Sequence, residues 1–432
     1  MSVFESDYLS WDSLPESQQT AYEWNCLREP DIHNPISDAN NLYNAMLKAR
    51  KNTAWKESVQ KFCWDYLQEI AHLQIKLDRL EKGEPESYTP GKGYEFMLNE
   101  RGRMRPICGQ TFSDRVVSHA LNDVVLVPSI LSHLIYDNTA SIKGRGVDMA
   151  RRRLRAHLTR YFSRNGTNIG FVRLKDQSKY YDNIRHEVTF EQISLFTDNL
   201  LALKLVVLLL KASELDVSYM TDEEFDRSME TRIDRVAYRD ANHKKTGQKM
   251  LKKGLNVGDQ FSQTAGILYP YRVDSMAKYV QGSLYYARYM DDSYDIDSDV
   301  VTLRARAKAI DDESYRVGMF TNERKSCILR IDKGFVYLQH KFKLLPDGTI
   351  YERLLPKAVT RLKRRLKKLK LKVDAGILPL RDVLNMYRSW EISKRDYLSY
   401  MQVHTLERLI LNLYGRNAYE YVYDHDPKWK CA

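Results

Sequence analysis

The residues best suited to chemistry are two adjacent aspartates, Asp291 and Asp292, in the segment Tyr289-Met-Asp-Asp292 that follows a strand-like apolar run. Carboxylates this close repel each other, and both ionise readily only when a cation lies beside them. Hard carboxylate oxygens suit Mg²⁺, and two such ions roughly 3.5–4 Å apart can activate a hydroxyl and stabilise a leaving phosphate oxygen. The segment therefore predicts phosphoryl transfer. A surface hairpin with an acidic turn is the alternative interpretation.

A third carboxylate must come from elsewhere in the chain, and Asp176 ends the strand-like segment Phe171-Val-Arg-Leu-Lys-Asp176. It lies far from Asp291 in the sequence, so only folding can bring the two together. Asp182 is a competing candidate in the same stretch, but we expect it to cap or brace the helix that follows.

The elements that must position these residues alternate between short strands and helices, which is typical of an α+β fold. Strands are predicted at 171–174, 284–289 and 334–338. Helices are predicted at 41–83, 113–135, 146–162, 187–211 and 259–280, and from 357 onward. The polar segment 211–253 is predicted to be an insertion. The acidic stretch 1–40 is predicted to be a solvated extension, or else a shield for a basic surface.

The helix predicted from residue 357 is strongly basic. Its apolar stripe consists of Val359, Leu362, Leu366, Leu369 and Val373, and Lys and Arg side chains occupy most of the remaining positions. A solvated basic face is the simplest interpretation of such a helix. Because the helix follows a segment predicted to carry out phosphoryl transfer, we prefer the interpretation that its basic face lies along a nucleic-acid backbone.

The composition agrees with a nucleic-acid partner. The chain has 432 residues, which predicts two or three subdomains. Its 68 Lys and Arg residues against 57 Asp and Glu residues give a net charge of +11, and a basic excess favours binding to a polyanion.

Cysteine usage and hydropathy indicate a soluble protein of the reducing cytoplasm, with no membrane partner. The five cysteines are scattered and form no Cys-x-x-Cys pair, which argues against a disulfide framework and a cysteine zinc site. No signal peptide is visible. The longest apolar run, 200–210, is too short to span a bilayer and predicts a buried helix.

Taken together and in order, these motifs resemble those of bacterial reverse transcriptases, in the lineage that includes group II intron, diversity-generating and defence-associated enzymes. The similarity spans about residues 95–400 and is greatest to the stand-alone defence-associated members. The segments that resemble the fingers motifs, motifs A to E and the thumb are 104–107, 112–121, 140–146, 174–186, 254–263, 289–292, 318–325, 335–342 and 388–390.

The resemblance implies a right-hand polymerase fold of the α+β class, with an antiparallel palm sheet. The expected parts are a helical N-terminal extension at 1–94, fingers at 95–170, a palm at 171–345 and a helical thumb with a C-terminal tail at 346–432. It also implies that Asp176, Asp291 and Asp292 are catalytic and hold two Mg²⁺ ions, for which Mn²⁺ is a possible substitute.

Three substrate-binding roles follow from the resemblance. Arg105 would grip the incoming triphosphate through charge-assisted hydrogen bonds. Tyr181 would lie under the sugar and exclude a 2′-hydroxyl. Lys325 would lie near the pyrophosphate as a general acid. The alternatives are an Arg105 salt bridge, core packing of Tyr181 and a solvated Lys325. We expect Arg115 to form such a structural salt bridge in the fingers.

The segment that resembles motif B departs from the family pattern. Many relatives have Gln-Gly followed by Ser-Pro, whereas this chain has Val257-Gly258 and Ser262-Gln263. An aliphatic side chain cannot offer the amide contact that a glutamine makes to the nucleotide or template. We still expect Val257, Gly258 and Gln263 to bind substrate. The pattern resembles low-fidelity diversity-generating enzymes and some defence-associated ones.

The implied function is that of an RNA-directed DNA polymerase that makes cDNA from dNTPs on a dedicated non-coding RNA template, in antiphage defence. The alternatives are a low-fidelity diversity-generating enzyme, a template-independent or protein-primed DNA polymerase, and a non-catalytic RNA-binding protein. A tyrosine of the tail could serve as a protein primer, although aromatic packing is the simpler interpretation. The oligomeric state is not predictable from the sequence.

No His-Asn-His endonuclease with paired cysteines follows the thumb-like segment, and the remaining length does not accommodate an RNase H domain. The Val-Thr-Gly triplet of retron enzymes is also absent. A complete group II intron protein and a retron enzyme are therefore not expected.

Overall fold

The computed structural model describes residues 33–100, 102–238 and 245–419. The chain forms two compact units, each assembled from separate stretches of sequence. The first consists of Met1–His133, His186–Phe225 and Arg235–Ala265, and the second of Leu134–Arg185, Asp226–Asp234 and Gly266–Ala432. Most of the acidic stretch 1–40, including residues 1–32, lies outside the described residues.

The described part of the first unit starts with the helices α2 (Ala39–Arg50), α3 (Glu57–Trp64) and α4 (Tyr66–Lys82). The Asp38 side chain caps α2 by accepting hydrogen bonds from two backbone amides of the first turn. Gly83, at a φ of +76°, ends α4 in the left-handed conformation that glycine adopts at low cost. Capping residues in the sequence therefore set the start of α2 and the end of α4.

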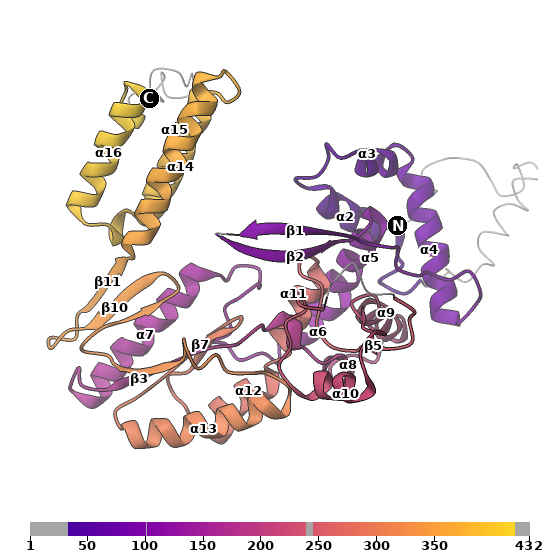
Figure 1. The fold of residues 1–432 in the computed structure, drawn as a ribbon, viewed down its shortest axis with the longest axis horizontal. Coiled ribbons are helices and arrows are strands. Elements are labelled where there is room, and N and C mark those ends of the chain that lie inside the picture. The colour runs from indigo at the N-terminus through magenta and orange to yellow at the C-terminus, as the bar shows by residue number, and fades with distance from the viewer. Residues whose placement is uncertain (1–32, 101, 239–244, 420–432) are drawn as a thin grey trace, which may run out of the picture. The chain divides into compact units, whose positions relative to one another are not determined.

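The first unit continues with an antiparallel hairpin and further helices, whose positions can be followed in Figure 1. The hairpin consists of β1 (Tyr94–Glu100) and β2 (Arg103–Gly109). The elements that follow are α5 (Phe112–Leu121), the π-helix η2 (Asn122–Leu126), α6 (Val127–Leu131), α8 (His186–Ser194), α9 (Leu200–Lys211), β4 (Leu215–Asp216) and β5 (Met250–Leu251). Helices α10 (Asp222–Glu230) and α11 (Gln260–Leu268) contain residues of both units.

The second unit is built on a four-stranded antiparallel sheet with the strand order β6-β7-β3-β8. Its strands are β3 (Phe171–Asp176), β6 (Ala287–Tyr289), β7 (Asp292–Asp297) and β8 (Cys327–Arg330). Helix α7 (Val147–Asn165) packs against the apolar face of this sheet. Helix α13 (Val300–Arg316) lies against β3 and β7, and its ion pairs reach the polar side chains Arg173, Lys175 and Asp295.

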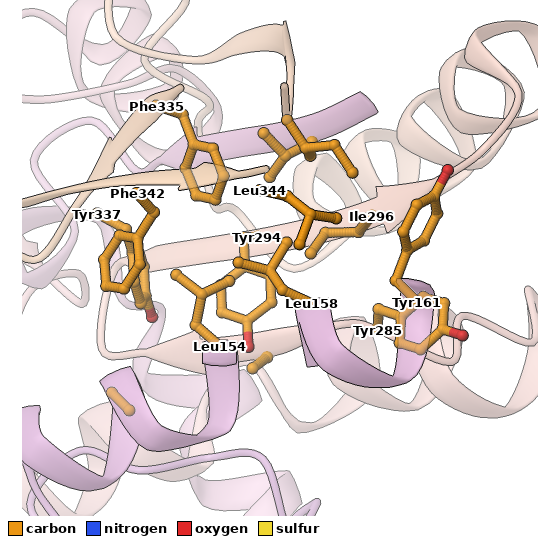
Figure 2. Packing of buried hydrophobic residues seen from close by; sticks show 14 residues of the cluster. Leu154, Leu158, Tyr161, Tyr285, Tyr294, Ile296, Phe335, Tyr337, Phe342 and Leu344 are labelled. Carbon is orange, nitrogen blue, oxygen red and sulfur yellow. The ribbon is translucent and has the colours of Figure 1, made fainter. Parts of the chain in front are cut away.

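The core of the second unit joins α7 to two sheets (Figure 2). Leu154 and Leu158 of α7 pack with Tyr294 of β7. The same cluster contains Phe335 and Phe342, which lie on β9 (Phe335–Tyr337) and β10 (His340–Leu344). With β11 (Ile350–Leu354), these strands form a three-stranded antiparallel sheet in the order β11-β10-β9. The two sheets and α7 therefore share one hydrophobic core.

A helical subdomain follows β11 and has its own core. Its elements are α14 (Pro356–Asp374), α15 (Leu380–Lys394), the 3₁₀ turn η5 (Arg395–Tyr397) and α16 (Tyr400–Tyr414). Leu366, Tyr387 and Leu406 are buried at its centre. The stripe predicted on the basic helix therefore packs inward, with Val359, Leu362 and Leu366 buried.

The predicted elements are confirmed in position, but several differ in length. The helical region predicted at 41–83 is three helices, α2, α3 and α4. The strand predicted at 284–289 is β6, which begins only at Ala287. The helix predicted at 187–211 is two helices, α8 and α9, because the chain turns at residues 195–199 and Asn199 caps α9. The helix predicted at 259–280 is interrupted before Pro270, which cannot continue the preceding helix. Its remainder is α12 (Tyr271–Ser275) and the π-helix η4 (Met276–Val280). Among the described helices, none has the length and apolar character needed to cross a membrane.

Candidate functional site

The pairing of β3 with β7 brings two of the predicted carboxylates together. The strands are antiparallel, and Asp176 lies directly opposite Asp292 in their register. Directly opposite residues in such a pair have Cα atoms roughly 4.5–5.5 Å apart and project from the same face. Because side chains alternate along a strand, both aspartates lie on the face that also carries Leu174 and Tyr294, opposite each other in the same pairing.

The β6–β7 hairpin places the remaining carboxylate beside this pair. Tyr289 pairs with Asp292, so Met290 and Asp291 form a two-residue turn between the strands. Met290 has a φ of +54°, the left-handed conformation that the first residue of such a tight hairpin turn requires. The turn therefore holds Asp291 at the end of the sheet, next to Asp292.

The resulting concentration of negative charge changes the acidity of Asp292. Burial raises the pKa of this carboxyl to about 7, and the nearby Asp291 and Asp176 carboxylates raise it as well, while Lys325 acts in the opposite direction. Burial and the repulsion from neighbouring carboxylates therefore disfavour ionisation of Asp292. A divalent cation would relieve that repulsion, so the chemistry of this donor set fits Mg²⁺.

The Asp176 carboxylate is held by two donors. Lys325 Nζ donates to Oδ1 at 2.7 Å, and Asn322 Nδ2 donates to Oδ2 at 2.7 Å. A carboxylate has about four lone-pair positions, so each oxygen keeps one for another partner. Among the described residues, no three His, Cys, Asp or Glu side chains are already gathered as metal ligands. Metal binding at the three aspartates would therefore require at least one of their side chains to turn toward a shared ion.

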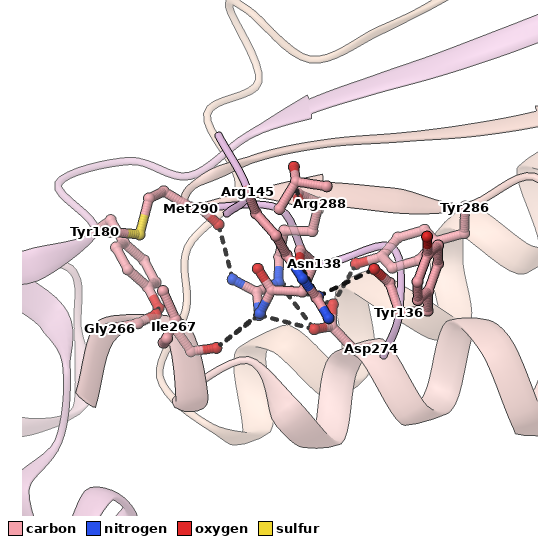
Figure 3. Close-up of polar contacts among 11 residues, drawn as sticks. Tyr136, Asn138, Arg145, Tyr180, Gly266, Ile267, Asp274, Tyr286, Arg288 and Met290 are labelled. Carbon is pink, nitrogen blue, oxygen red and sulfur yellow. Dashed lines mark hydrogen bonds and ion pairs between the residues drawn. The ribbon is translucent and has the colours of Figure 1, made fainter. Parts of the chain in front are cut away.

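A buried ion pair contacts the turn of the β6–β7 hairpin (Figure 3). Arg288 of β6 donates through Nε and Nη2 to the Asp274 carboxylate, at distances of 2.8–3.0 Å. Its Nη1 donates to the carbonyl of Met290, at 3.2 Å, and its Nη2 to the carbonyl of Ile267, at 2.7 Å. Tyr286 also donates to Asp274. One guanidinium therefore links the hairpin turn to the helical segment that contains Asp274.

The two tyrosines after β3 have different environments. Tyr180 is buried, and its hydroxyl donates to the carbonyl of Gly266 at 2.6 Å. Tyr181 is half-buried and lies against Gly266, where an added methyl group would be 2.9 Å from the Tyr181 hydroxyl. The absence of a side chain at Gly266 leaves room for the Tyr181 ring. The proposed contact of this ring with a sugar stays a prediction.

The other predicted substrate-binding residues lie in the first unit. Arg105 is exposed on β2, opposite Leu98 of β1. Gly258 has a φ of +123° and approaches the same strand, because a side chain there would meet Ile107 at 3.3 Å. Val257 is half-buried and Gln263 is exposed. The first unit thus brings the motif B segment next to the strand that carries Arg105.

Two further features of the first unit hold the motif B segment. Asp259 is buried and accepts a hydrogen bond from the backbone amide of Ser262 at the start of α11. Burial raises the pKa of Asp259 to about 6. Nε2 of His186 lies 2.8 Å from the carbonyl of Gly254, which ties the start of α8 to this segment.

Arg115 has a structural role, but the salt bridge expected of it is not formed with any described carboxylate, and the partners of its guanidinium are uncharged oxygens. Its guanidinium donates to the carbonyl of Ala49 and to the hydroxyl of Thr53. In the tail, the Tyr414 hydroxyl donates to the carbonyl of Leu366, and the Tyr419 hydroxyl donates to Glu391. The tail tyrosines at 421 and 423 lie outside the described residues.

Reasoning from the sequence missed the residues that support the aspartates. Asn322 lies in the segment that resembles motif D, but nothing in its type or spacing points to Asp176. Arg288 and Asp274 are separated by an irregular stretch of chain, so their pairing was not predictable. A charged residue in the middle of the apolar strand segment 284–289 was the one available signal, because a buried charge requires a partner.

No protein-family model matches the sequence, and a search among curated proteins finds no match. Among solved structures, the chain is similar to apo telomerase from Candida tropicalis truncated from its C-terminal domain, with a TM-score of 0.39 and 13% identity, over 60% of this chain and 54% of that chain. It is also similar to telomerase from Candida albicans in complex with a TWJ fragment of telomeric RNA, with a TM-score of 0.41 and 12% identity, over 84% of this chain and 64% of that one. The chain thus spans less than two thirds of the length of either telomerase chain.

Proposed function

We propose that this protein is an RNA-directed DNA polymerase in which Asp176, Asp291 and Asp292 form the catalytic centre. The observation that carries the proposal is the register of β3 and β7. It sets Asp176 opposite Asp292, beside the Asp291 turn, although the two strands are far apart in the sequence. An acidic surface turn alone would have no need of a third carboxylate from another strand.

The three carboxylates would hold two Mg²⁺ ions, which when bound activate a primer 3′-hydroxyl and stabilise the leaving pyrophosphate. Asp176 and Asp291 would contact both ions and Asp292 would assist. Lys325, whose ammonium lies 2.7 Å from Asp176 Oδ1, has the length and charge to reach a nearby phosphate oxygen. It is half-exposed, so it can leave the carboxylate when a substrate phosphate arrives.

The proposed template is one dedicated non-coding RNA, the proposed substrates are dNTPs and the proposed role is antiphage defence. The ordered similarity of the motifs to defence-associated reverse transcriptases supports this assignment. The contact between Tyr181 and Gly266 supports only the choice of dNTPs, because it keeps an aromatic ring close to the end of β3, where a ring under the sugar would exclude a 2′-hydroxyl.

The test is primer extension on an RNA template in the presence of Mg²⁺ and dNTPs. The parent protein is compared with the Asp291→Ala, Asp292→Ala double variant and with Asp312→Ala, which removes an exposed carboxylate from α13. We expect the double variant to lose at least 1,000-fold in rate, because it removes two of the three proposed metal ligands, and Asp312→Ala to match the parent.

Equal DNA synthesis by the double variant and the parent would refute the catalytic assignment. Sequencing the product distinguishes the alternatives. A faithful complement of the RNA supports reverse transcription, frequent substitutions support a low-fidelity diversity-generating enzyme, and a product unrelated to the RNA supports template-independent synthesis.

A further inference from the structure

We propose that Asn322 is a positioning residue for the metal-binding carboxylate of Asp176. Its amide would fix the plane of that carboxylate by holding Oδ2. The inference rests on the proposed function and adds to it a residue that does not itself contact the metal or the substrate.

The loop that carries Asn322 is attached to the end of β3 by its backbone. The backbone amide of Asn322 donates to the carbonyl of Asp176 at 2.8 Å, and the amide of Asp176 donates to the Ser326 hydroxyl at 3.1 Å. Gln177 and Thr321 form an isolated β-bridge beside these contacts. These contacts of the loop do not involve the side chain at position 322.

The position of the Asn322 side chain is fixed from within the loop. The carbonyl of Asn322 accepts hydrogen bonds from the amides of Lys325 and Ser326, at 3.0 and 2.9 Å. From this anchored backbone, Nδ2 donates to Asp176 Oδ2 at 2.7 Å. The short, rigid reach of the amide makes this contact a geometric constraint on the carboxylate.

Such a constraint is needed because the terminal torsion of an aspartate is soft. Rotation about the bond to the carboxyl carbon has a broad preference, so an unsupported carboxylate samples many orientations. Asp176 has a side chain that is only 14% exposed, and the described donors to its two oxygens are Asn322 and Lys325. Hydrogen bonds of this kind orient metal ligands in many proteins, and their loss typically costs about 10–100-fold in metal affinity.

Asn322 and Lys325 differ in what they do to the charge of Asp176. The ammonium of Lys325 neutralises the carboxylate and competes with a metal ion for it. The amide of Asn322 is neutral, so it orients Oδ2 and leaves the full negative charge available to a cation. This difference assigns the positioning role to Asn322.

The experiment measures Mn²⁺ binding to the full-length protein by electron paramagnetic resonance, without nucleotide or nucleic acid. The proteins are the parent, Asn322→Ala and Asn168→Ala. Asn168 is the matched control because its Nδ2 donates to the carbonyl of Leu344 in the same unit, and its loss removes an equivalent hydrogen bond. The Asp291→Ala, Asp292→Ala variant measures how much Mn²⁺ binds at sites other than the three aspartates.

We expect Asn322→Ala to bind Mn²⁺ at least 10-fold more weakly than the parent, and Asn168→Ala to bind it as the parent does. In primer extension, Asn322→Ala should need a correspondingly higher Mg²⁺ concentration for half-maximal rate. Equal Mn²⁺ affinity of Asn322→Ala and the parent would overturn the proposal. Equal weakening by both alanine variants would also overturn it, since the effect would then be a general loss of stability.

If Asn322→Ala does not fold, the Mn²⁺ affinity of Asn322→Leu is compared with that of the parent instead. Leucine has a similar shape to asparagine and lacks the hydrogen-bond donor. The two proposals fail separately. A parent protein that synthesises no DNA contradicts the polymerase function, whereas a parent that synthesises DNA with unchanged Mn²⁺ binding in Asn322→Ala contradicts only the positioning role.

Discussion

At the scale of single residues, Arg288, which precedes the aspartate turn, carries a buried charge. The side chains of Arg288 and Asp274 are only 3% and 2% exposed. A buried charge of this kind is tolerated because the guanidinium donates to a carboxylate and to two carbonyls. The pair fixes where the hairpin turn lies, and with it the main-chain position of Asp291.

Removing one member of this pair should strongly destabilise the second unit. We expect Asp274→Leu to lower the free energy of unfolding by about 3–5 kcal/mol, because it leaves the Arg288 charge buried without a partner. The double variant Arg288→Met, Asp274→Leu should recover most of that loss, as apolar replacement of a buried pair often does. Urea denaturation measures both values. A double variant as unstable as the single one would contradict this account.

At the scale of elements, helix α14 has two faces with separate roles. One face packs into the helical subdomain through Val359, Leu362 and Leu366. The opposite face carries exposed cations, among them Arg364 and Lys368. Because the packed face is fully used for the core, the basic face is the surface of α14 available to a nucleic-acid backbone.

The basic face of α14 should contribute to the salt dependence of nucleic-acid binding. We expect Arg364→Gln, Lys368→Gln to weaken binding to an RNA–DNA hybrid and to reduce the slope of log K against log salt by about 2, because each lost phosphate contact removes roughly one released counterion. Fluorescence anisotropy at several salt concentrations measures the slope.

Helix α13 offers a matched control for this experiment. Arg304 and Lys308 are an exposed Arg and Lys with the same spacing of four residues, so Arg304→Gln, Lys308→Gln removes the same charge from a different surface. We expect this variant to leave the slope unchanged. Equal effects of the two double variants would mean that only the net charge matters.

At the scale of the whole molecule, each unit contains a buried histidine that makes the folded state less stable at low pH. Burial lowers the pKa of His157 to about 4, despite the nearby Asp137 carboxylate. Burial likewise lowers the pKa of His186 to about 4, despite its contact with the Gly254 carbonyl. An unfolded chain would protonate both histidines near pH 6.5.

The sign of the resulting pH dependence follows from these values. Between pH 6.5 and 4 the unfolded state binds protons that the folded state does not, so stability falls as the pH falls through this window. The loss is about 3 kcal/mol for each histidine once the pH is below both pKa values. We expect His157→Phe to lose less stability than the parent between pH 7 and 5, measured by thermal unfolding. An unchanged pH dependence would show that His157 titrates normally in the folded state.

The sequence by itself predicted the candidate catalytic residues and the position of most elements. Paired aspartates, a third aspartate at the end of a strand and the periodicity of α7, α9 and α14 are local signals, because they depend on residue type and spacing alone. Breaks at residues 195–199 and at Pro270 were harder to place, since a capping or turn residue interrupts a helical pattern without changing its apolar periodicity.

Only the tertiary structure decided which residues act together. The pairing of Asp176 with Asp292 depends on a strand register formed across a long stretch of chain. The contacts of Asn322 and Arg288 depend on where a loop and a helical segment pack against that sheet. Polar partners of this kind leave no periodic trace in the sequence, because each is fixed by a single meeting of distant segments and not by a repeating pattern along one element.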